Sequence, residues 1–284
     1  MGKYKLHKKV TIRKRNPLIP QGVSAEEMAL CNAIHLDFPK LQIYRSDRNV
    51  LHGREIDIWI PSKKLGVEFN GNRYHSSAMN KTEGYHLSKS IMAEKQGIKL
   101  LHIFSDMWEN KKSLVIDLIR KLLGRYREFD IKDCSIQKIS KKEGEFFFNT
   151  YRIDGVDYRA TKFLGIFYNG YNVAALQYSA KGIYGYSEIF GIKIKGGLEE
   201  LLKNSELEKL NVYTDRCLLE YLVWEDIGYK PVDCTKPRLF YTKDFKTRIL
   251  NESTDLDEKQ KKKMYTIYDC GELILKRFEE KAST

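Results

Sequence analysis

The sequence predicts an α/β domain followed by an α+β domain, and three features point to this. Residues 24 to 124 contain apolar runs of helix and strand length in the order α-β-β-β-α-β-α. After a polar link, shorter strand-like and helix-like runs follow in mixed order. The chain has 284 residues, 42% of them hydrophobic, which is enough for two cores. We expect three parts: a basic arm (1–22), a first domain (23–126) and a second domain with a tail (131–284).

Local signals support each element of the first domain. Ser24 followed by Glu27 has the spacing of a capping box, which predicts a helix start. Gly53 and Pro61 separate runs of strand-like composition, and Gly97 marks a helix end. The expected elements are therefore a helix from 24, strands at 41–46, 54–60 and 64–71, a helix at 83–96, a buried strand at 98–105 and an amphipathic helix at 111–124.

The second domain reads as a mixture of short strands and helices. Its strands are expected at 134–140, 161–169, 171–179, 184–194, 211–216 and 238–243, and its helices at 141–152, 196–206 and 218–227. The remainder, from 246 on, carries a charged run at 257–263 and is expected to be a tail.

The charge indicates a polyanionic partner. The formal net charge is +12, which is typical of proteins that bind nucleic acid, although a merely basic soluble protein has the same signature. The arm over 1–22 is rich in lysine and arginine and has no acidic residue, so we expect it to contact DNA phosphates through Lys8, Lys9, Arg13, Lys14 and Arg15.

Several classes of protein are not expected. No apolar run approaches the ~20 residues that span a bilayer, and the N-terminus lacks the apolar stretch of a secretory signal. The five cysteines are widely spaced, without a Cys-x-x-Cys pair, so neither a zinc ribbon nor a disulfide framework is indicated. We expect no membrane partner and a cytoplasmic protein with reduced thiols.

A candidate site lies in the segment from residue 54 to 77. Asp57 falls on one expected strand, and Glu68 and Asn70 share a face of the next, because strand side chains alternate. If the two strands form a hairpin, Asp57 lies beside that face. Two carboxylates there would suit Mg²⁺ or Mn²⁺, which could polarise a phosphodiester and activate water. Asp57 and Glu68 are the expected metal ligands.

Further polar residues could join this site. His75 could act as a general base, since an imidazole titrates near neutral pH. Glu27 would come from the preceding helix, and His86 and Lys89 share one face of the following helix. Each of the site candidates has an ordinary alternative: Glu27 as a capping residue, Asp57 as a solvated strand-edge residue, Glu68 as the partner of a lysine, His75 as a surface loop residue and His86 as a capping or packing residue.

The joint pattern resembles a known family. The Asp-x₁₀-Glu-x-Asn strand pair, Asp57 to Asn70, is similar to the PD-(D/E)XK nuclease fold, with Asn70 where lysine is usual. Asp57 followed by the segment from Gly71 to His75 resembles the very-short-patch-repair (Vsr-like) branch, and phage-borne homing endonucleases of the EDxHD kind in particular. The resemblance covers about residues 24 to 124 and implies a mixed sheet flanked by helices.

The resemblance also implies residue roles. Asp57 would hold the metal, His75 would be the general base, and Glu27 would take the place of the family's helix glutamate. Glu83 and His86 are alternatives for the second acidic position of the motif. Tyr74 stands where the family often has tryptophan and could stack on bases. Tyr74, Asn70 and Arg73 are therefore expected to contact DNA.

The second domain resembles the C-terminal half of phage homing-type endonucleases, which has an acyltransferase-like α+β arrangement. The Gly196-Gly197 helix start only partly fits a pyrophosphate-binding turn, because Leu198 stands where a small residue is expected. A simple turn is the preferred interpretation, and acetyl-CoA is not expected as a ligand. We interpret this half as a DNA-recognition or scaffolding module.

These observations together predict a Mg²⁺-dependent DNA endonuclease of phage homing type, active on double-stranded DNA in the host cytoplasm. A mismatch-directed nickase and a DNA-binding protein with an inactive nuclease core are the alternatives, and an acyltransferase with a basic arm ranks below both. The sequence leaves open whether a single chain nicks one strand or a homodimer cuts both.

Overall fold

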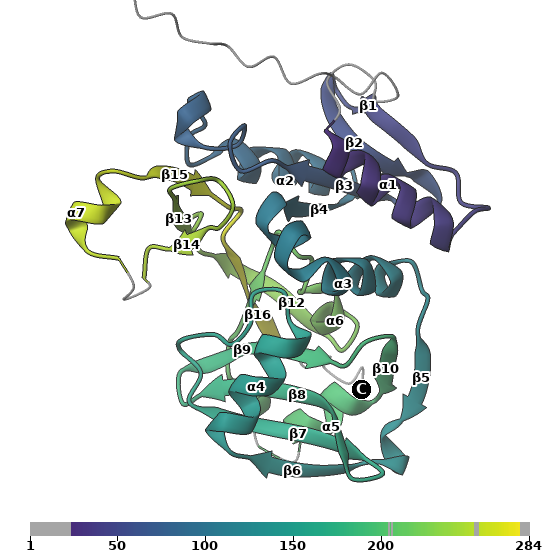
Figure 1. Cartoon of the computed structure of the whole chain (residues 1–284). Helices are drawn as coiled ribbons and strands as arrows, with labels where there is room; N and C mark the ends of the chain where they lie inside the picture. Colours follow the sequence, from purple (N-terminus) through teal and green to yellow (C-terminus); the bar gives the residue numbers. More distant parts are fainter. Residues whose placement is uncertain (1–23, 204, 206, 253–255, 279–284) are drawn as a thin grey trace, which may run out of the picture.

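The structure is a computed structural model that describes residues 24–203, 205, 207–252 and 256–278. It is a mixed α/β protein with several sheets and helices α1 to α7 in this part of the chain (Figure 1). The basic arm expected at 1–22 lies outside the described residues, and so do the DNA contacts expected of Lys8, Lys9, Arg13, Lys14 and Arg15. None of the described helices combines the length and the apolar character that crossing a membrane requires.

The first sheet has four strands in the order β1-β2-β3-β4. Its strands are antiparallel except for β3 and β4, which run parallel. A parallel pair needs a crossover connection, and α2 supplies it. The elements are α1 (Ala25–Asp37), β1 (Tyr44–Leu51), β2 (Arg54–Ile60), β3 (Leu65–Asn70), α2 (Tyr85–Lys95), β4 (Lys99–Phe104) and α3 (Ser105–Leu122). The observed order α-β-β-β-α-β-α is the one that the sequence predicts.

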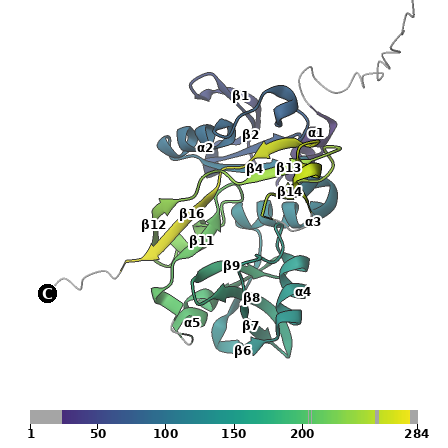
Figure 2. The same cartoon turned by 90° about the vertical axis from the view of Figure 1, so that its left-hand side faces the viewer.

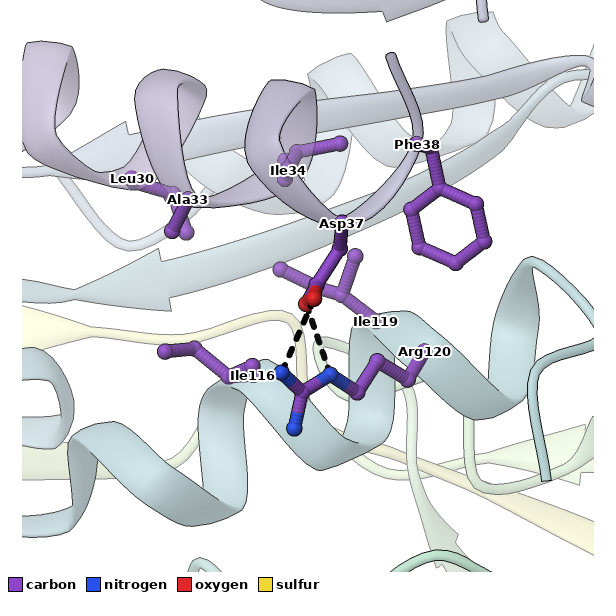
Figure 3. A pocket seen from close by; sticks show the side chains of 8 residues that line it. All are labelled: Leu30, Ala33, Ile34, Asp37, Phe38, Ile116, Ile119 and Arg120. Carbon is purple, nitrogen blue, oxygen red and sulfur yellow. Dashed lines mark hydrogen bonds and ion pairs between the residues drawn. The ribbon is translucent and has the colours of Figure 1, made fainter. Parts of the chain in front are cut away.

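Helices cover both faces of this sheet. Leu100 and Leu101 are neighbours on β4 and therefore point to opposite faces. Leu100 packs in a cluster with Ala93 of α2, whereas Leu101 belongs to the cluster that includes Leu30 of α1. On that second face α1 and α3 are tied together by Asp37 and Arg120, with a distance of 2.6 Å between Asp37 Oδ2 and Arg120 Nε (Figure 3).

The second half is built on a seven-stranded sheet in the order β12-β16-β11-β9-β8-β7-β6. Its pairs are antiparallel except for the parallel pair of β9 and β11. The elements are β6 (Ser135–Ile139), α4 (Lys141–Tyr151), β7 (Lys162–Tyr168), β8 (Tyr171–Ser179), β9 (Gly182–Glu188), α5 (Gly197–Lys203), β11 (Val212–Asp215), α6 (Leu222–Glu225), β12 (Tyr229–Cys234) and β16 (Glu272–Arg277).

Three predictions about the strands of this half were wrong in detail. The polar link contains a strand, β5 (Arg127–Asp130), which pairs in parallel with β10 (Ile192–Lys195). The strand expected at 184–194 is two strands, β9 and β10, which belong to different sheets. The expected tail contributes β16, which lies between β12 and β11 inside the large sheet. All three features depend on pairing between strands that are distant in the sequence, and local sequence patterns do not indicate such pairing.

A third sheet, of three strands, comes from the same C-terminal region. Its order is β14-β13-β15, with β13 (Leu239–Thr242), β14 (Ile249–Leu250) and β15 (Tyr265–Tyr268), and α7 (Glu258–Lys261) precedes β15. We call residues 238–268, as far as they are described, the appendage. Both views place the appendage beside the first sheet, away from β6 and β7 (Figures 1 and 2).

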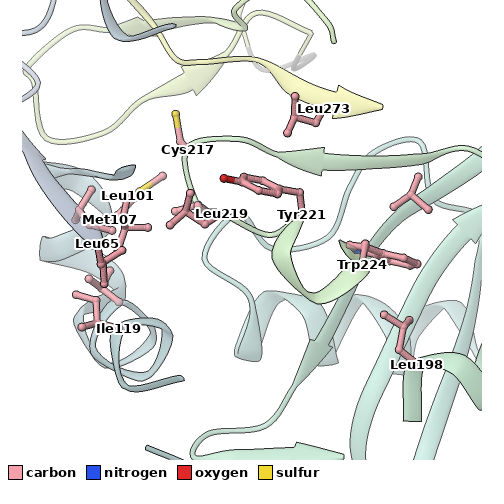
Figure 4. Close-up of a cluster of buried hydrophobic side chains, with 14 of the residues drawn as sticks. Leu65, Leu101, Met107, Ile119, Leu198, Cys217, Leu219, Tyr221, Trp224 and Leu273 are labelled. Carbon is pink, nitrogen blue, oxygen red and sulfur yellow. The ribbon is translucent and has the colours of Figure 1, made fainter. Parts of the chain in front are cut away.

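The apolar core crosses the boundary expected between the two domains. A single cluster joins Leu101 and Met107 of the first half to Leu219, Trp224 and Leu273 of the second (Figure 4). The backbone N–H of His102 also donates to the carbonyl of Cys217, at 2.9 Å. The two halves are therefore packed against each other through buried side chains and a backbone hydrogen bond.

Candidate functional site

Three charged residues meet at the end of the β2–β3 hairpin. Ile58 pairs with Val67, and the same antiparallel register sets Asp57 opposite Glu68. Lys89 reaches this pair from α2 and forms a hydrogen-bonded ion pair with Glu68 Oε2. We call Asp57, Glu68 and Lys89 the carboxylate–lysine cluster. It brings together three of the residues that the sequence predicted for one site.

Burial dominates the electrostatics of this cluster. Glu68 is 3% exposed. Burial raises the pKa of Asp57 well above its usual range, and the negative charge of Glu68 raises it further. The backbone N–H of Phe69 donates to Asp57 Oδ2 at 2.7 Å and opposes this shift only in part. Asp57 is therefore a carboxyl group that holds its proton more tightly than an exposed aspartate.

Glu27 lies close enough to belong to the same electrostatic site. It is buried in the first turn of α1, where its N–H donates to Ser24 Oγ at 2.9 Å. Burial raises its pKa, and the charge of Glu68 adds to the rise. Glu27 therefore stands in the first turn of the helix that Ser24 caps, as the capping box predicts, and it interacts electrostatically with Asp57 and Glu68.

The two expected metal ligands lie side by side, but one carboxyl oxygen of each already accepts a hydrogen bond. One oxygen of Asp57 accepts the Phe69 N–H, and one oxygen of Glu68 accepts from Lys89. In the described part of the chain, no three or more His, Cys, Asp and Glu side chains form a group that could hold a metal ion. Lys89 is the cation that the structure brings to this site. Binding of Mg²⁺ or Mn²⁺ by Asp57 and Glu68 stays a prediction.

His75 and His86 come together as the sequence predicted. Their rings stack, with centroids 5.1 Å apart and an angle of 18° between the planes. Burial lowers the pKa of His75 to about 3 and that of His86 well below its usual value, so both rings are neutral at physiological pH. Of the two alternatives for the second acidic position, His86 is buried in this stack and Glu83 is exposed.

The row of imidazoles continues to a residue that the sequence analysis did not single out. His102 on β4 lies 5.5 Å from His86 between ring centroids. Its Nε2 is 2.9 Å from Ser90 Oγ, which in turn is 3.2 Å from Cys270 Sγ. A histidine inside the otherwise apolar run 100–104 was the available signal, because a polar side chain in a buried strand needs a partner.

Cys270 is buried at the inner end of this row. Burial raises the pKa of its thiol, but hydrogen bonding with Cys217 and the charge of His102 outweigh that effect and lower it to about 5. The thiol is 1% exposed, which agrees with the sequence interpretation of a packed cysteine. Its partners stabilise the thiolate without exposing it to a reactant.

Several atoms of the site lack a hydrogen-bond partner among the described residues. Buried polar atoms are ordinarily satisfied, so such a group indicates a place for water, protons or a ligand. These atoms are Glu27 Oε1, Glu68 Oε1, Asn70 Oδ1, His75 Nδ1 and His86 Nε2.

A turn beside the site carries two exposed residues predicted to contact DNA. Arg73 and Tyr74 are exposed, Tyr74 by 63%. The turn is fixed from within: Asn72 is 1% exposed, its N–H donates to Ser105 Oγ and its side-chain amide to Asp106. Ser76 Oγ donates to the carbonyl of Arg73 at 2.9 Å. The turn is thus anchored by buried polar side chains.

One expected DNA contact is corrected. Asn70 is fully buried at the end of β3, and its side-chain amide lies 3.3 Å from His102 Nδ1. A side chain without exposed surface cannot contact DNA. Asn70 instead orients the innermost imidazole of the row.

Comparisons with known proteins add little to this geometry. No protein-family model and no curated protein matches the chain. Among solved structures, an IAA acetyltransferase from Bacillus cereus ATCC 14579 matches with a TM-score of 0.27 and 13% sequence identity, over 50% of this chain and 96% of that chain. A match of this TM-score does not assign a fold or an activity.

The expected enzyme class is nevertheless corrected. The sequence predicted a Mg²⁺-dependent DNA endonuclease, whereas the solved structure that matches carries the name of an acetyltransferase, which is a different class of enzyme.

Proposed function

We propose that this chain is a double-stranded-DNA-binding protein whose first domain has the frame of a Vsr-like member of the PD-(D/E)XK superfamily and acts without cutting DNA. The order α-β-β-β-α-β-α around a mixed four-stranded sheet supports that frame. Within it, Asp57 and Glu68 lie opposite each other on β2 and β3, and His75 stacks on His86 of α2, the helix that also carries Lys89. The second half would act as an acyltransferase-like scaffold that supports the first.

The observation that carries the proposal is the anchored turn with Arg73 and Tyr74. An exposed arginine can pair with phosphates, and an exposed aromatic ring can stack on a base. The turn presents both at low entropic cost, because Asn72 and Ser76 already fix its backbone. The net charge of +12 supplies the long-range attraction to a polyanion.

The carboxylate–lysine cluster supports a binding function without hydrolysis. Lys89 neutralises Glu68, and burial favours the protonated form of Asp57, so the site presents less negative charge to a phosphate than two free carboxylates would. Repulsion between the site and a DNA backbone is reduced accordingly.

The test is binding of a fluorescently labelled DNA duplex, measured by anisotropy with EDTA present and at several salt concentrations. Tyr74→Ala should weaken binding about fivefold or more, because stacking on a base contributes on the order of 1–3 kcal/mol. Tyr171→Ala is the matched control, since Tyr171 is 76% exposed on β8 in the other half. The proposal fails if the wild-type protein does not bind duplex DNA, or if the two variants bind equally well.

A second measurement addresses the absence of cleavage. Supercoiled DNA incubated with the protein and Mg²⁺ should stay supercoiled. Conversion to nicked or linear circles by wild-type protein, and not by Asp57→Ala protein, would contradict the non-enzymatic part of the proposal.

A further inference from the structure

The appendage carries exposed lysines on its connecting segments. Lys243 and Lys246 lie between β13 and β14, and Lys259, Lys262 and Lys263 lie on α7 and directly after it. None of these five side chains makes an ion pair or hydrogen bond within the described part of the chain. We call these five residues the lysine face. Their charges are available to a partner.

Three acidic residues of the appendage make contacts that do not involve the ammonium groups of the lysine face. Asp257 caps α7, where its Oδ1 accepts the N–H of Gln260 at 2.7 Å. Asp244 Oδ1 accepts the N–H of Lys246 at 2.9 Å. Glu258 pairs with Lys261, which is outside the lysine face. These carboxylates stabilise turns and the helix of the appendage, and their pairing leaves the five lysine ammonium groups uncompensated by a direct contact.

Two hydrogen bonds hold the appendage next to the turn with Arg73 and Tyr74. The side-chain amide of Asn72 donates to the carbonyl of Phe245 at 3.2 Å. The N–H of Thr266 on β15 donates to Ser77 Oγ at 2.9 Å. One strand connection and one strand of the appendage therefore contact Asn72 and Ser77, which lie on either side of Arg73 and Tyr74.

Arg248 fixes the appendage to the first domain more firmly. Its side chain is 5% exposed and pairs with Asp106 at the start of α3, at 2.8 Å. Its guanidinium also lies 3.7 Å from the centre of the Phe104 ring. A buried arginine held by a carboxylate and an aromatic face is a rigid anchor. The appendage is thus attached to the first domain by contacts that its position in the sequence does not suggest.

We propose that the lysine face binds the phosphate backbone of the same DNA duplex that the turn with Arg73 and Tyr74 contacts, so that the appendage extends the DNA-binding surface of the first domain. This inference rests on the proposed function. The partner is the sugar–phosphate backbone, because lysines supply point charges and no base-specific pattern of hydrogen bonds. The appendage would contribute affinity and salt dependence, and the turn would contribute contacts to bases.

The test uses the full chain with three lysines of the face replaced, K259A/K262A/K263A. The matched control is K138A/K141A/K142A, which makes the same change in net charge at exposed lysines on β6 and α4. Each phosphate contact contributes about 0.9 to the slope of log K against log salt, so three lost contacts should reduce the slope by about 2.7. At about 0.1 M salt this corresponds to a loss of affinity of about 500-fold.

Three outcomes separate this inference from the proposed function. A reduced slope in the first variant alone supports the inference. Wild-type binding with equal slopes in both triple variants overturns it and leaves DNA binding intact. If the wild-type protein does not bind duplex DNA, both proposals are refuted. Equal melting temperatures of the two variants and the wild type would show that the comparison is made on folded protein.

Discussion

Replacing Lys89 by methionine tests the account of the carboxylate–lysine cluster most directly. Methionine keeps most of the side-chain volume and removes the ammonium group. The Lys89 and Glu68 side chains are 14% and 4% exposed, so the remaining carboxylate of Glu68 would be buried beside Asp57 without its cation. Breaking a buried pair in this way typically costs about 3–5 kcal/mol.

The loss from K89M should therefore be about 3–5 kcal/mol near pH 7. Adding Glu68→Gln to K89M should recover most of this loss, because it removes the buried carboxylate that is left without its cation.

Urea unfolding followed by circular dichroism measures the loss. Lys95→Met is the matched control, because Lys95 is exposed in the last turn of the same helix and should change stability by less than about 0.5 kcal/mol. If K89M loses no more stability than K95M at neutral pH, the ion pair does not contribute as described and the reasoning is refuted.

Two further predictions concern titration. Burial raises the pKa of Asp57, so the contribution of this carboxyl group to stability is present below the unfolded-state pKa of about 3.8 and is lost as pH rises. Asp57→Asn should therefore stabilise the protein near neutral pH in urea unfolding, with a gain that shrinks toward about pH 4. A loss of stability at neutral pH would contradict this. The pKa of His75 is lowered to about 3, so its contribution is present above about pH 6.5 and is lost on acidification. Between about pH 3 and pH 6.5, His75→Gln should reduce the change of the unfolding free energy with pH by up to about 1.4 kcal/mol per pH unit. If thermal melts give the same dependence of stability on pH for variant and wild type, the low pKa of His75 is contradicted.

Much of the first domain could be predicted because its signals are local. Ser24 caps α1, Gly97 follows α2, and the apolar run at 98–105 forms β4. The spacing from Asp57 to Glu68 reflects a short hairpin, in which a simple register sets residues opposite each other. Lys89 and His86 fall on the same face of α2 because three residues make almost one helical turn.

The second half shows where local signals fail. The helix expected at 218–227 is only the four residues of α6, since neighbouring residues form turns around buried side chains such as Leu218 and Leu219. The segment after residue 264 looked like a tail, yet β16 pairs with two strands that are distant in sequence. Pairing partners of this kind are set by tertiary packing, which overrides strand and helix propensity.

The sequence by itself determined the order of elements in the first domain and two short-range groupings, because short hairpins and helix periodicity fix neighbours over short distances. These groupings are Asp57 opposite Glu68 with Lys89 beside it, and His75 beside His86. Only the tertiary structure decided that His102 and Cys270 extend the imidazole row and that the appendage lies against the turn at residue 73. It also decided that Asn70 faces inward. These contacts join residues up to 189 positions apart, as between Ser77 and Thr266, and no local pattern can encode which distant surfaces pack against one another.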